Sequence, residues 1–292
     1  MADILYEDNH VLVAVKPPNM LSQADITGDT DILTLLKVYL KEKYGKPGNV
    51  YLGLVHRLDR PVGGLMVFAR TSKAASRLSA QLRVHEMGRE YLCVVLGEIP
   101  ENDFTLQDYL VKDEVRNRVT VCDADTRGAQ LAILHGHVVE RRQNTSLCAI
   151  RLETGRNHQI RVQMSAMGHP LWGDNRYGRG IPGQQIALWG YRLVFEHPVT
   201  HEEMVFHDMP YGSVWDIYRD YLAIPGDLSG GDKHPDPEEL REEERETYRE
   251  LFDQVIQPEP EVFRETEAGG LDPAGPGNDL HDENPGKGTT EA

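Results

Sequence analysis

Two short segments, far apart in the chain, carry the side chains best suited to chemistry. The first is His56-Arg57-Leu58-Asp59-Arg60, which comes before an apolar stretch expected to form a strand at 65–69. Asp59 therefore ends a loop that leads into a buried strand, and catalytic and binding residues are common at such positions. The flanking arginines, Arg57 and Arg60, favour the ionised carboxylate, which suits a nucleophile or a general base. A purely structural ion pair at a strand edge is the alternative reading.

The second segment runs from Thr154 to Arg161 in the order TGRNHQIR and is expected to open a helix. His158 and Arg161 are three residues apart and so fall on one helical face. We expect Arg161 to project into a cleft with His158 beside it. As an alternative, Arg156 and His158 only satisfy backbone groups at the helix start.

The elements that must position these segments form a mixed pattern. Asp31 is the expected N-cap of a helix that ends near Gly45, and a second helix is expected at 73–87. Neighbouring strand candidates are mostly separated by turns short enough for antiparallel pairing. We predict an α+β fold with a mixed, largely antiparallel sheet and flanking helices, rather than an alternating β-α-β plan. The strand candidates are 10–16, 65–69, 91–96, 118–122, 131–139, 147–152 and 186–195.

Composition sets the class of protein. The chain has 292 residues, 39% of them hydrophobic, and no apolar run of the length needed to cross a membrane. Its first residues lack the basic start and apolar stretch of a secretory signal. Cys93, Cys122 and Cys148 are scattered and form no CxxC pair, which argues against a thiolate zinc site. We expect a soluble, cytoplasmic protein.

The negative charge is concentrated at the C-terminal end. Residues 226–292 hold 20 Asp and Glu against 6 Lys and Arg, a net charge of -14 out of -16, so 1–225 has a net charge of -2. A local basic cleft in the first part is compatible with that balance. We expect a catalytic domain at 1–225, an acidic, helical extension at 226–257, and a disordered acidic tail at 258–292, where almost no apolar residues occur.

Several motifs, in order along the chain, resemble the RluA-type pseudouridine synthase family. The resemblance covers roughly residues 5 to 215, and the long motif that begins at Thr154 is too specific to be chance. Only about ten residues precede the first expected strand, so we expect a short form without the S4 RNA-binding domain of many relatives, in which the catalytic domain recognises RNA itself. The motifs are VKPP at 15–18, HRLD at 56–59, REYL at 89–92 and TGRNHQIRVQMSAMGHPLWGDNRYG at 154–178.

The resemblance implies a pseudouridine synthase-like catalytic domain that isomerises specific uridines of tRNA or rRNA without a metal or cofactor, and we expect it to act as a monomer. Asp59 matches the catalytic aspartate, which attacks the sugar or removes a sugar proton. Tyr91 matches the tyrosine that stacks on the target base, and Arg161 the arginine that pairs with the carboxylate. Arg57 matches the arginine associated with the displaced nucleotide. The expected substrate-binding residues are Arg57, Arg60, Arg156 and His158.

The sequence departs from the family pattern directly after the first motif. The family usually has Thr-Ser-Gly where this chain has Val62-Gly63-Gly64. The loss of two hydroxyl groups leaves a second hypothesis open, an RNA-binding or ribosome-assembly factor of weak or no activity on the same fold. Asp174, in the turn-prone sequence 173–177, is expected to belong to a structural loop and not to be a second catalytic acid.

Overall fold

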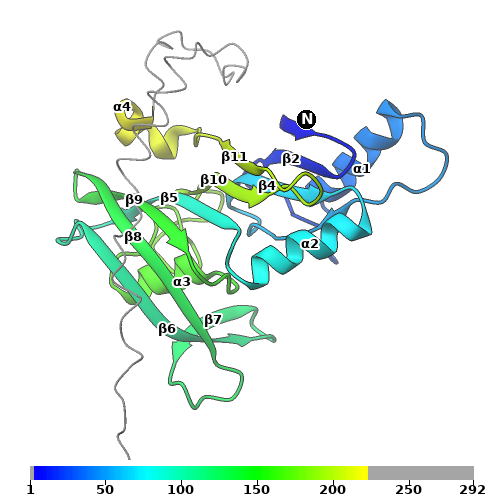
Figure 1. Cartoon of the computed structure of the whole chain (residues 1–292). Coiled ribbons are helices and arrows are strands. Elements are labelled where there is room, and N and C mark those ends of the chain that lie inside the picture. The colour runs from blue at the N-terminus through cyan, green and yellow to red at the C-terminus, as the bar shows by residue number, and fades with distance from the viewer. Residues whose placement is uncertain (1–2, 223–292) are drawn as a thin grey trace, which may run out of the picture. The chain divides into compact units, whose positions relative to one another are not determined.

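The computed structural model describes residues 3–222, and its strands form a single sheet (Figure 1). Along the sheet the strands follow the order β1-β2-β4-β10-β5-β9-β8-β6-β7, with β11 paired to β10 and β3 to β4. All described pairings are antiparallel except that of β4 with β10. The strands are β1 Asp3–Glu7, β2 Val11–Lys16, β3 Gly53–Leu54, β4 Gly63–Ala69, β5 Gly88–Leu96, β6 Asp103–Asp113, β7 Arg118–Cys122, β8 Gln130–Arg142, β9 Thr145–Leu152, β10 Leu188–Glu196 and β11 Glu203–His207.

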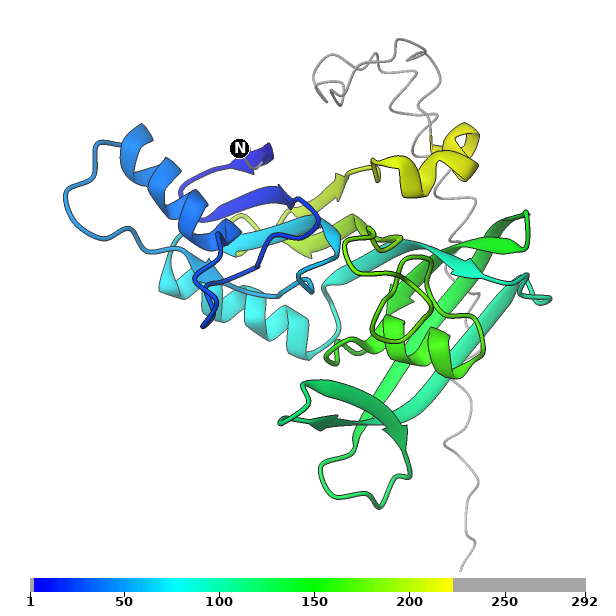
Figure 2. The same cartoon turned by 180° about the vertical axis from the view of Figure 1, so that it is seen from behind.

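Helices cover both faces of the central strands. Because successive side chains of a strand point to opposite faces, each apolar strand contributes to a core on either side. On β2, Leu12 and Ala14 join the core beneath α1 and α3, whereas Val11 and Val13 join the core beneath α2 and η1. Figures 1 and 2 show α2 and α1 on opposite sides of β4. The central strands β2, β4 and β5 are thus buried on both sides, which explains their near-continuous apolar sequences. The helices are α1 Ile32–Lys43, α2 Ser72–Arg83, α3 Gln159–Ala166, the 3-10 helix η1 Ser213–Tyr218 and α4 Arg219–Leu222.

The structure confirms the α+β prediction and corrects some boundaries. Asp31 caps α1 by accepting a hydrogen bond from the Thr34 backbone N–H at 2.9 Å. The second helix ends at Arg83, four residues before the predicted end. It ends because His85 adopts a left-handed φ of 60° and the Glu86 N–H reaches back to the Gln81 carbonyl at 3.0 Å, the pattern of a Schellman cap.

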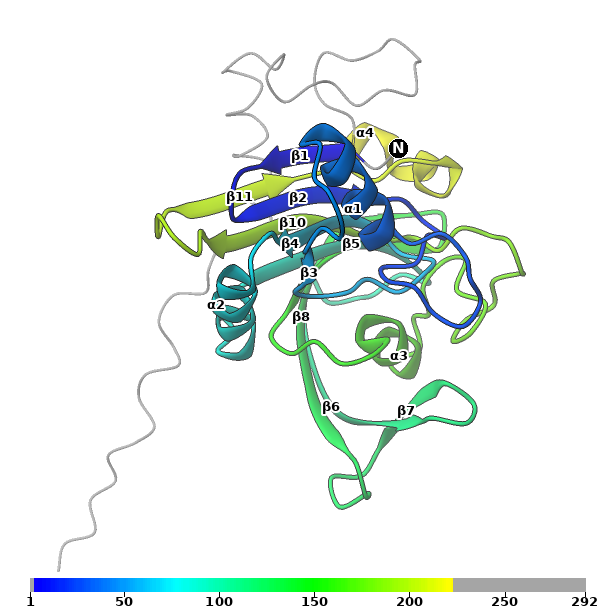
Figure 3. The ribbon, with the colours of Figure 1, turned by 90° about the vertical axis from the view of Figure 1, so that its right-hand side faces the viewer.

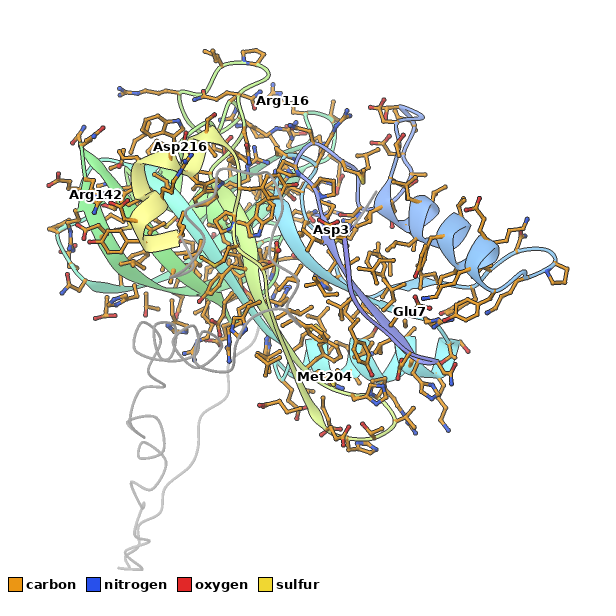
Figure 4. All side chains as sticks on the ribbon, turned by 90° about the horizontal axis from the view of Figure 1, so that it is seen from above. Asp3, Glu7, Arg116, Arg142, Met204 and Asp216 are labelled. Atoms are coloured by element: carbon orange, nitrogen blue, oxygen red, sulfur yellow. The ribbon has the colours of Figure 1, made fainter. Side chains whose placement is uncertain are left out.

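Strands β6 and β7 form a hairpin that extends the sheet on the side of α3 (Figure 3). The sequence analysis predicted β7 but missed β6, although Phe104, Leu106 and Leu110 are at alternating positions and less exposed than most of their neighbours. The structure also adds β1, β3 and β11 to the predicted strands. At the other end of β8, Arg142 lies beside η1 and donates to the Ile217 carbonyl at 3.3 Å (Figure 4, where Arg142 and Asp216 are labelled).

The acidic, helical extension and the disordered tail predicted from the sequence lie outside the described residues. Within residues 3–222, no helix is long and apolar enough to cross a bilayer.

Candidate active site

Asp59 lies in the loop between β3 and β4, and main-chain contacts fix that loop. The Val62 N–H donates to the Asp59 carbonyl at 3.0 Å and closes the turn. Ser22 both donates to the Leu58 carbonyl at 2.7 Å and accepts from the Leu58 N–H at 3.1 Å. Beneath the loop, the ammonium of Lys16, from the VKPP motif, donates to three carbonyls, those of Pro17, Met20 and Arg60. The loop therefore holds its shape without help from hydroxyl side chains at 62 and 63.

Lys16 is fully buried, and its position is electrostatically costly. Burial lowers the pKa of Lys16 to about 7, while the nearby Asp59 carboxylate opposes that shift and Arg60 adds to it. The three carbonyl acceptors offset the loss of water around the ammonium group. Lys16 thus anchors the Asp59 loop from below.

The partner of Asp59 is Arg161, which comes from α3. Arg161 Nη1 lies 3.1 Å from Asp59 Oδ2, and the arginine side chain is only 5% exposed. On its other edge the guanidinium makes two hydrogen bonds to Asp174, with Nε to Oδ2 at 2.8 Å and Nη2 to Oδ1 at 2.9 Å. Such a two-pronged pair fixes the plane of the guanidinium, so Asp174 aims Nη1 at Asp59.

Charge balance keeps this buried arginine ionised. Burial alone would lower the pKa of Arg161, but the hydrogen bonds and negative charge of Asp174, together with Asp59, raise it above the ordinary value. Burial likewise favours a protonated Asp174, yet the bonds from Arg161 and from the backbone N–H groups of Arg176 and Tyr177 lower its pKa. The sequence analysis had assigned Asp174 to a structural loop. The structure makes it the carboxylate that orients Arg161.

His158 occupies the remaining side of Asp59. Its Nε2 lies 3.7 Å from Asp59 Oδ2, and its Nδ1 lies 2.6 Å from the hydroxyl of Tyr177. Burial lowers the pKa of His158, which the Asp59 carboxylate opposes and Arg161 reinforces. The residue precedes α3 in a left-handed conformation with φ 53°. His158 and Arg161 lie together beside the same carboxylate, as expected, although His158 is outside the helix and the two do not share a helical face.

Tyr91, from β5, lines the same small pocket as Asp59, along with apolar side chains such as Leu188. It is buried, and burial raises the pKa of Tyr91, with Arg89 opposing and Asp59 reinforcing the rise. Arg89 lies against the backbone of Gly155, where a Cβ atom would be 2.4 Å from its Nη1. The Nε of Arg89 is buried and has no hydrogen-bond partner among the described residues. The pocket thus combines an aromatic ring, a carboxylate and a guanidinium.

A wider groove continues from this pocket across the surface. Among the described residues, seven arginine and lysine side chains but only two carboxylates line it. The groove is therefore a local basic cleft, which the net charge of -2 over residues 1–225 allowed. The basic side chains are Arg57, Arg60, Lys112, Arg89, Arg156, Arg161 and Arg176.

The predicted substrate-binding residues all line the groove, but the ion pair of Arg60 is with Asp29 and not with the neighbouring Asp59. Arg57 is exposed. Arg60 pairs with Asp29 at 2.7 Å and donates to the Asn19 carbonyl at 3.3 Å, so it holds the 19–29 loop rather than Asp59. Arg156 donates through Nε to the Leu131 carbonyl at 2.8 Å.

The departure at Val62-Gly63-Gly64 has a structural counterpart on β10. The ring of Trp189 lies so close to Gly63 that a Cβ atom there would be 2.1 Å from Trp189 Cζ3. At Gly64, which has φ 122°, a Cβ atom would be 2.4 Å from the Gly190 backbone. The indole N–H of Trp189 donates to Asp208 at 3.0 Å. Gly63 begins β4 and leaves space for an indole ring.

Two further residues support the site and were missed as site residues. Gln159 ties the motif loop to β8: its Oε1 accepts from the Thr154 hydroxyl and the Arg156 N–H, and its Nε2 donates to the Ile133 carbonyl at 3.0 Å. His56 accepts the Val67 N–H through Nε2 at 3.1 Å, and burial, with Arg89 adding, lowers its pKa to about 3. Their placement within the two motifs was the only signal in the sequence.

Sheet, pocket and basic groove together are those of an enzyme that works on a nucleotide drawn into a polar pocket. A model of the RNA pseudouridylate synthase family matches residues 10–166. The chain belongs to this family, which isomerises uridine in RNA to pseudouridine, as the resemblance to its RluA-type members predicted.

Individual relatives support the same assignment. Ribosomal large subunit pseudouridine synthase D of Zymomonas mobilis is 34% identical over 221 residues, which cover 71% of this chain and 69% of that protein. The uncharacterized RNA pseudouridine synthase YlyB of Bacillus subtilis is 37% identical over 210 residues, with 70% and 67% covered. Human RNA Pseudouridylate Synthase Domain Containing 4 shares the fold with a TM-score of 0.61 at 20% identity, over 75% of this chain and 92% of that one.

Proposed function

We propose that this enzyme converts one or more uridines of large-subunit ribosomal RNA to pseudouridine, with Asp59 as its catalytic residue. The observation that carries the proposal is the arrangement of Asp59, which is held by an arginine that Asp174 aims at it, in a pocket that Tyr91 lines. The choice of ribosomal RNA rests on relatives that are named ribosomal large subunit pseudouridine synthase D.

The geometry fits what the isomerisation requires. The bond between uracil N1 and the sugar must break, the base must turn, and a bond from its C5 to the sugar must form, with no atom gained overall. Asp59 would assist by attacking the sugar or by removing a sugar proton, and both routes need an ionised and directed carboxylate. Arg161 supplies the direction. Tyr91 offers a ring on which the detached base can stack.

The groove would hold the rest of the RNA. An enzyme that acts on a base must take it out of the stack and hold the flanking backbone. Arg57 is exposed beside Asp59 and can occupy the place of the displaced nucleotide, while Arg60 and Arg156 offer positive charge to phosphates from positions fixed by Asp29 and by β8. We further propose that a monomer suffices, because one chain supplies every residue of the site, and that it acts in the cytoplasm on ribosomal RNA.

The alternative, a binding factor of weak or no activity, rests on the missing hydroxyl groups at 62 and 63. The turn after Asp59 is closed by the hydrogen bond from the Val62 N–H to the Asp59 carbonyl, and Trp189 fills the space over Gly63. Neither contact needs a side-chain hydroxyl. The substitutions therefore leave the position of Asp59 supported, which favours the enzyme.

The test is pseudouridine mapping by carbodiimide adduct and reverse transcription. Total RNA would be compared from cells that lack the gene and carry either the wild-type protein or Asp59→Asn, which keeps the shape of the side chain but removes its charge. We expect a stop in large-subunit ribosomal RNA that only the wild type restores. A stop confined to transfer RNA would overturn the choice of substrate. An equal stop with both proteins would overturn the role of Asp59.

A further inference from the structure

Tyr177 lies where the second motif, helix α3 and the β6–β7 hairpin meet. Its ring is flanked by two guanidinium groups, with Arg161 5.2 Å and Arg118 5.3 Å from the ring centroid. Its hydroxyl lies 2.6 Å from His158 Nδ1 and 3.0 Å from the backbone nitrogen of Val119 on β7. One side chain thus contacts the hairpin, the arginine of the site and the histidine of the site.

The hydrogen bonds around Tyr177 favour one tautomer of His158. The Val119 N–H can only donate, so the Tyr177 oxygen accepts from it, and of these two partners only His158 Nδ1 can accept the proton of the Tyr177 hydroxyl. A neutral imidazole that accepts at Nδ1 carries its proton on Nε2. Burial favours the neutral ring, because it lowers the pKa of His158. The Nε2–H therefore faces Asp59 Oδ2 at 3.7 Å.

The same contacts connect this pair to the wall of the RNA groove. Two residues of the hairpin line the groove: Lys112, the second-last residue of β6, and Asn117, the last residue before β7. Next to Tyr177, Arg176 donates to the Asn117 carbonyl at 2.6 Å. RNA bound against the hairpin would thus press on an element that is hydrogen-bonded to Tyr177.

We propose that Tyr177 and His158 are positioning residues that link the β6–β7 hairpin to the catalytic carboxylate, with the Tyr177 hydroxyl holding the His158 ring so that its Nε2–H faces Asp59. The inference rests on the proposed role of Asp59 and gives His158 a second role beyond the substrate contact expected from sequence. It places the link between RNA binding and catalysis in side chains that belong to neither the HRLD nor the REYL motif.

The backbone at His158 allows a sharp choice of variants. Its φ of 53° is left-handed, a conformation that asparagine adopts more readily than most residues. His158→Asn should therefore keep the backbone and the acceptor for Tyr177, but it is too short to reach Asp59. His158→Gln places an amide donor near the position of Nε2 and loses the Tyr177 acceptor, at some cost in backbone strain. Tyr177→Phe keeps the ring between the two arginines and removes only the hydroxyl group.

The measurements are kcat and KM on the RNA substrate and the thermal midpoint of each full-length variant. We expect kcat to fall at least about tenfold in His158→Asn and less in His158→Gln, with KM for RNA within about twofold of wild type. The thermal midpoints should rank in the opposite order, since asparagine suits the left-handed backbone better. Tyr177→Phe should lower kcat severalfold, yet change nothing further in the His158→Asn background. Tyr51→Phe, at a half-exposed tyrosine that lines neither the pocket nor the groove, should match wild type.

A purely structural role predicts instead that kcat follows stability, with His158→Gln the worse variant, and that result would overturn the inference. A second measurement needs no RNA, so it separates this inference from the substrate proposal. Nitrogen-15 NMR of the imidazole rings, with His158 assigned by its absence in His158→Asn, should show the Nε2–H tautomer in wild type and a mixture in Tyr177→Phe. An Nδ1–H tautomer in wild type would equally overturn it.

Discussion

At the scale of single residues, the central feature of the site is that two side chains, Arg161 and His158, approach the carboxylate of Asp59. Asp59 Oδ2 has Arg161 Nη1 at 3.1 Å and His158 Nε2 at 3.7 Å, and the side chain remains 27% exposed. The carboxylate is thus directed from within the protein and open toward the groove. Asp174 never touches Asp59 in this arrangement, yet it determines where Arg161 points.

Removal of the charge on Asp174 should therefore damage both stability and turnover. Asp174→Asn leaves Arg161 buried with only Asp59 to balance it, and loss of one partner of a buried pair costs about 3–5 kcal/mol. We expect a lower free energy of unfolding in urea and a lower kcat at a temperature where the variant is folded. Asp29→Asn, which breaks the exposed pair with Arg60, should cost under about 1 kcal/mol. Equal stability of Asp174→Asn and wild type would contradict this account.

Asp208 should give the protein a characteristic pH dependence. Burial raises the pKa of Asp208 to about 7, although the bond from Trp189 opposes the rise. The folded state then holds a proton between about pH 4 and pH 7 that an unfolded aspartate releases, so the stability from this group falls as pH rises through that window. His56, with a lowered pKa, acts in the opposite sense, so wild type alone does not isolate the effect.

The measurement is the difference in unfolding free energy between wild type and Asp208→Asn from pH 5 to pH 8. We expect wild type to lose stability relative to the variant as pH rises, by at most about 3 kcal/mol, because about two pH units separate pH 5 from the folded pKa of Asp208. A constant difference across that range would show that Asp208 does not titrate there.

At the scale of elements, β4 and β10 form the one parallel contact among the described strands, and it lies next to the loop that carries Asp59. Trp189 packs over Gly63 at this contact, so the two strands approach more closely than a side chain at 63 would allow. Glycine at position 63 leaves room for the indole ring of Trp189, where the family pattern usually has serine.

Gly63→Ala should therefore be strongly unfavourable. Overpacking of a close contact costs typically about 1–3 kcal/mol, because the ring must leave its position. Gly190→Ala is the matched control on β10, since a Cβ atom there would have its nearest contact at an ordinary 3.5 Å. In a Trp189→Leu background the cost of Gly63→Ala should shrink, which thermal unfolding of the four combinations would reveal. Equal costs in both backgrounds would show that Trp189 is not the obstacle.

The elements also show what the sequence could and could not predict. Strands with unbroken apolar runs, such as β2, and the Asp31 cap are local patterns, and their prediction was confirmed. β6 was missed because its alternation is weakened by Asp108 and Tyr109. His158 and Arg161 were correctly expected to lie side by side, although His158 precedes α3 in a left-handed conformation and is not part of the helix. The contacts of Asp174 and Trp189 could not be predicted, because they join segments whose proximity depends on the folded sheet.

At the scale of the whole molecule, charge is distributed very unevenly. The chain has a net charge of -16, yet the groove beside Asp59 is lined mainly by arginine and lysine. RNA binding should therefore depend on local and not on net charge. Phosphate contacts release counterions, so affinity falls with salt concentration in proportion to the number of contacts.

Removal of one groove arginine should lower that salt dependence. For Arg57→Gln or Arg60→Gln we expect weaker RNA binding and a slope of log K against log salt reduced by about 0.7–0.9, the value for one phosphate contact. Lys41→Gln, on α1 and outside the groove, should leave the slope unchanged. Filter binding or fluorescence anisotropy over a salt series would decide. An unchanged slope in both arginine variants would place the phosphates elsewhere.

The position of β10 has a consequence for how the protein is made. In the sheet order β10 lies between β4 and β5, and no other described strand joins β1-β2-β4 to β5-β9-β8-β6-β7. Asp59 belongs to the first group and Arg161 follows the second, so the ribosome must release residues 188–196 before the two halves can align. Until that moment the nascent chain has two unfinished sheet edges, and Asp59 and Arg161 are not held together. An enzyme proposed to modify ribosomal RNA thus gains its own activity only late in its translation.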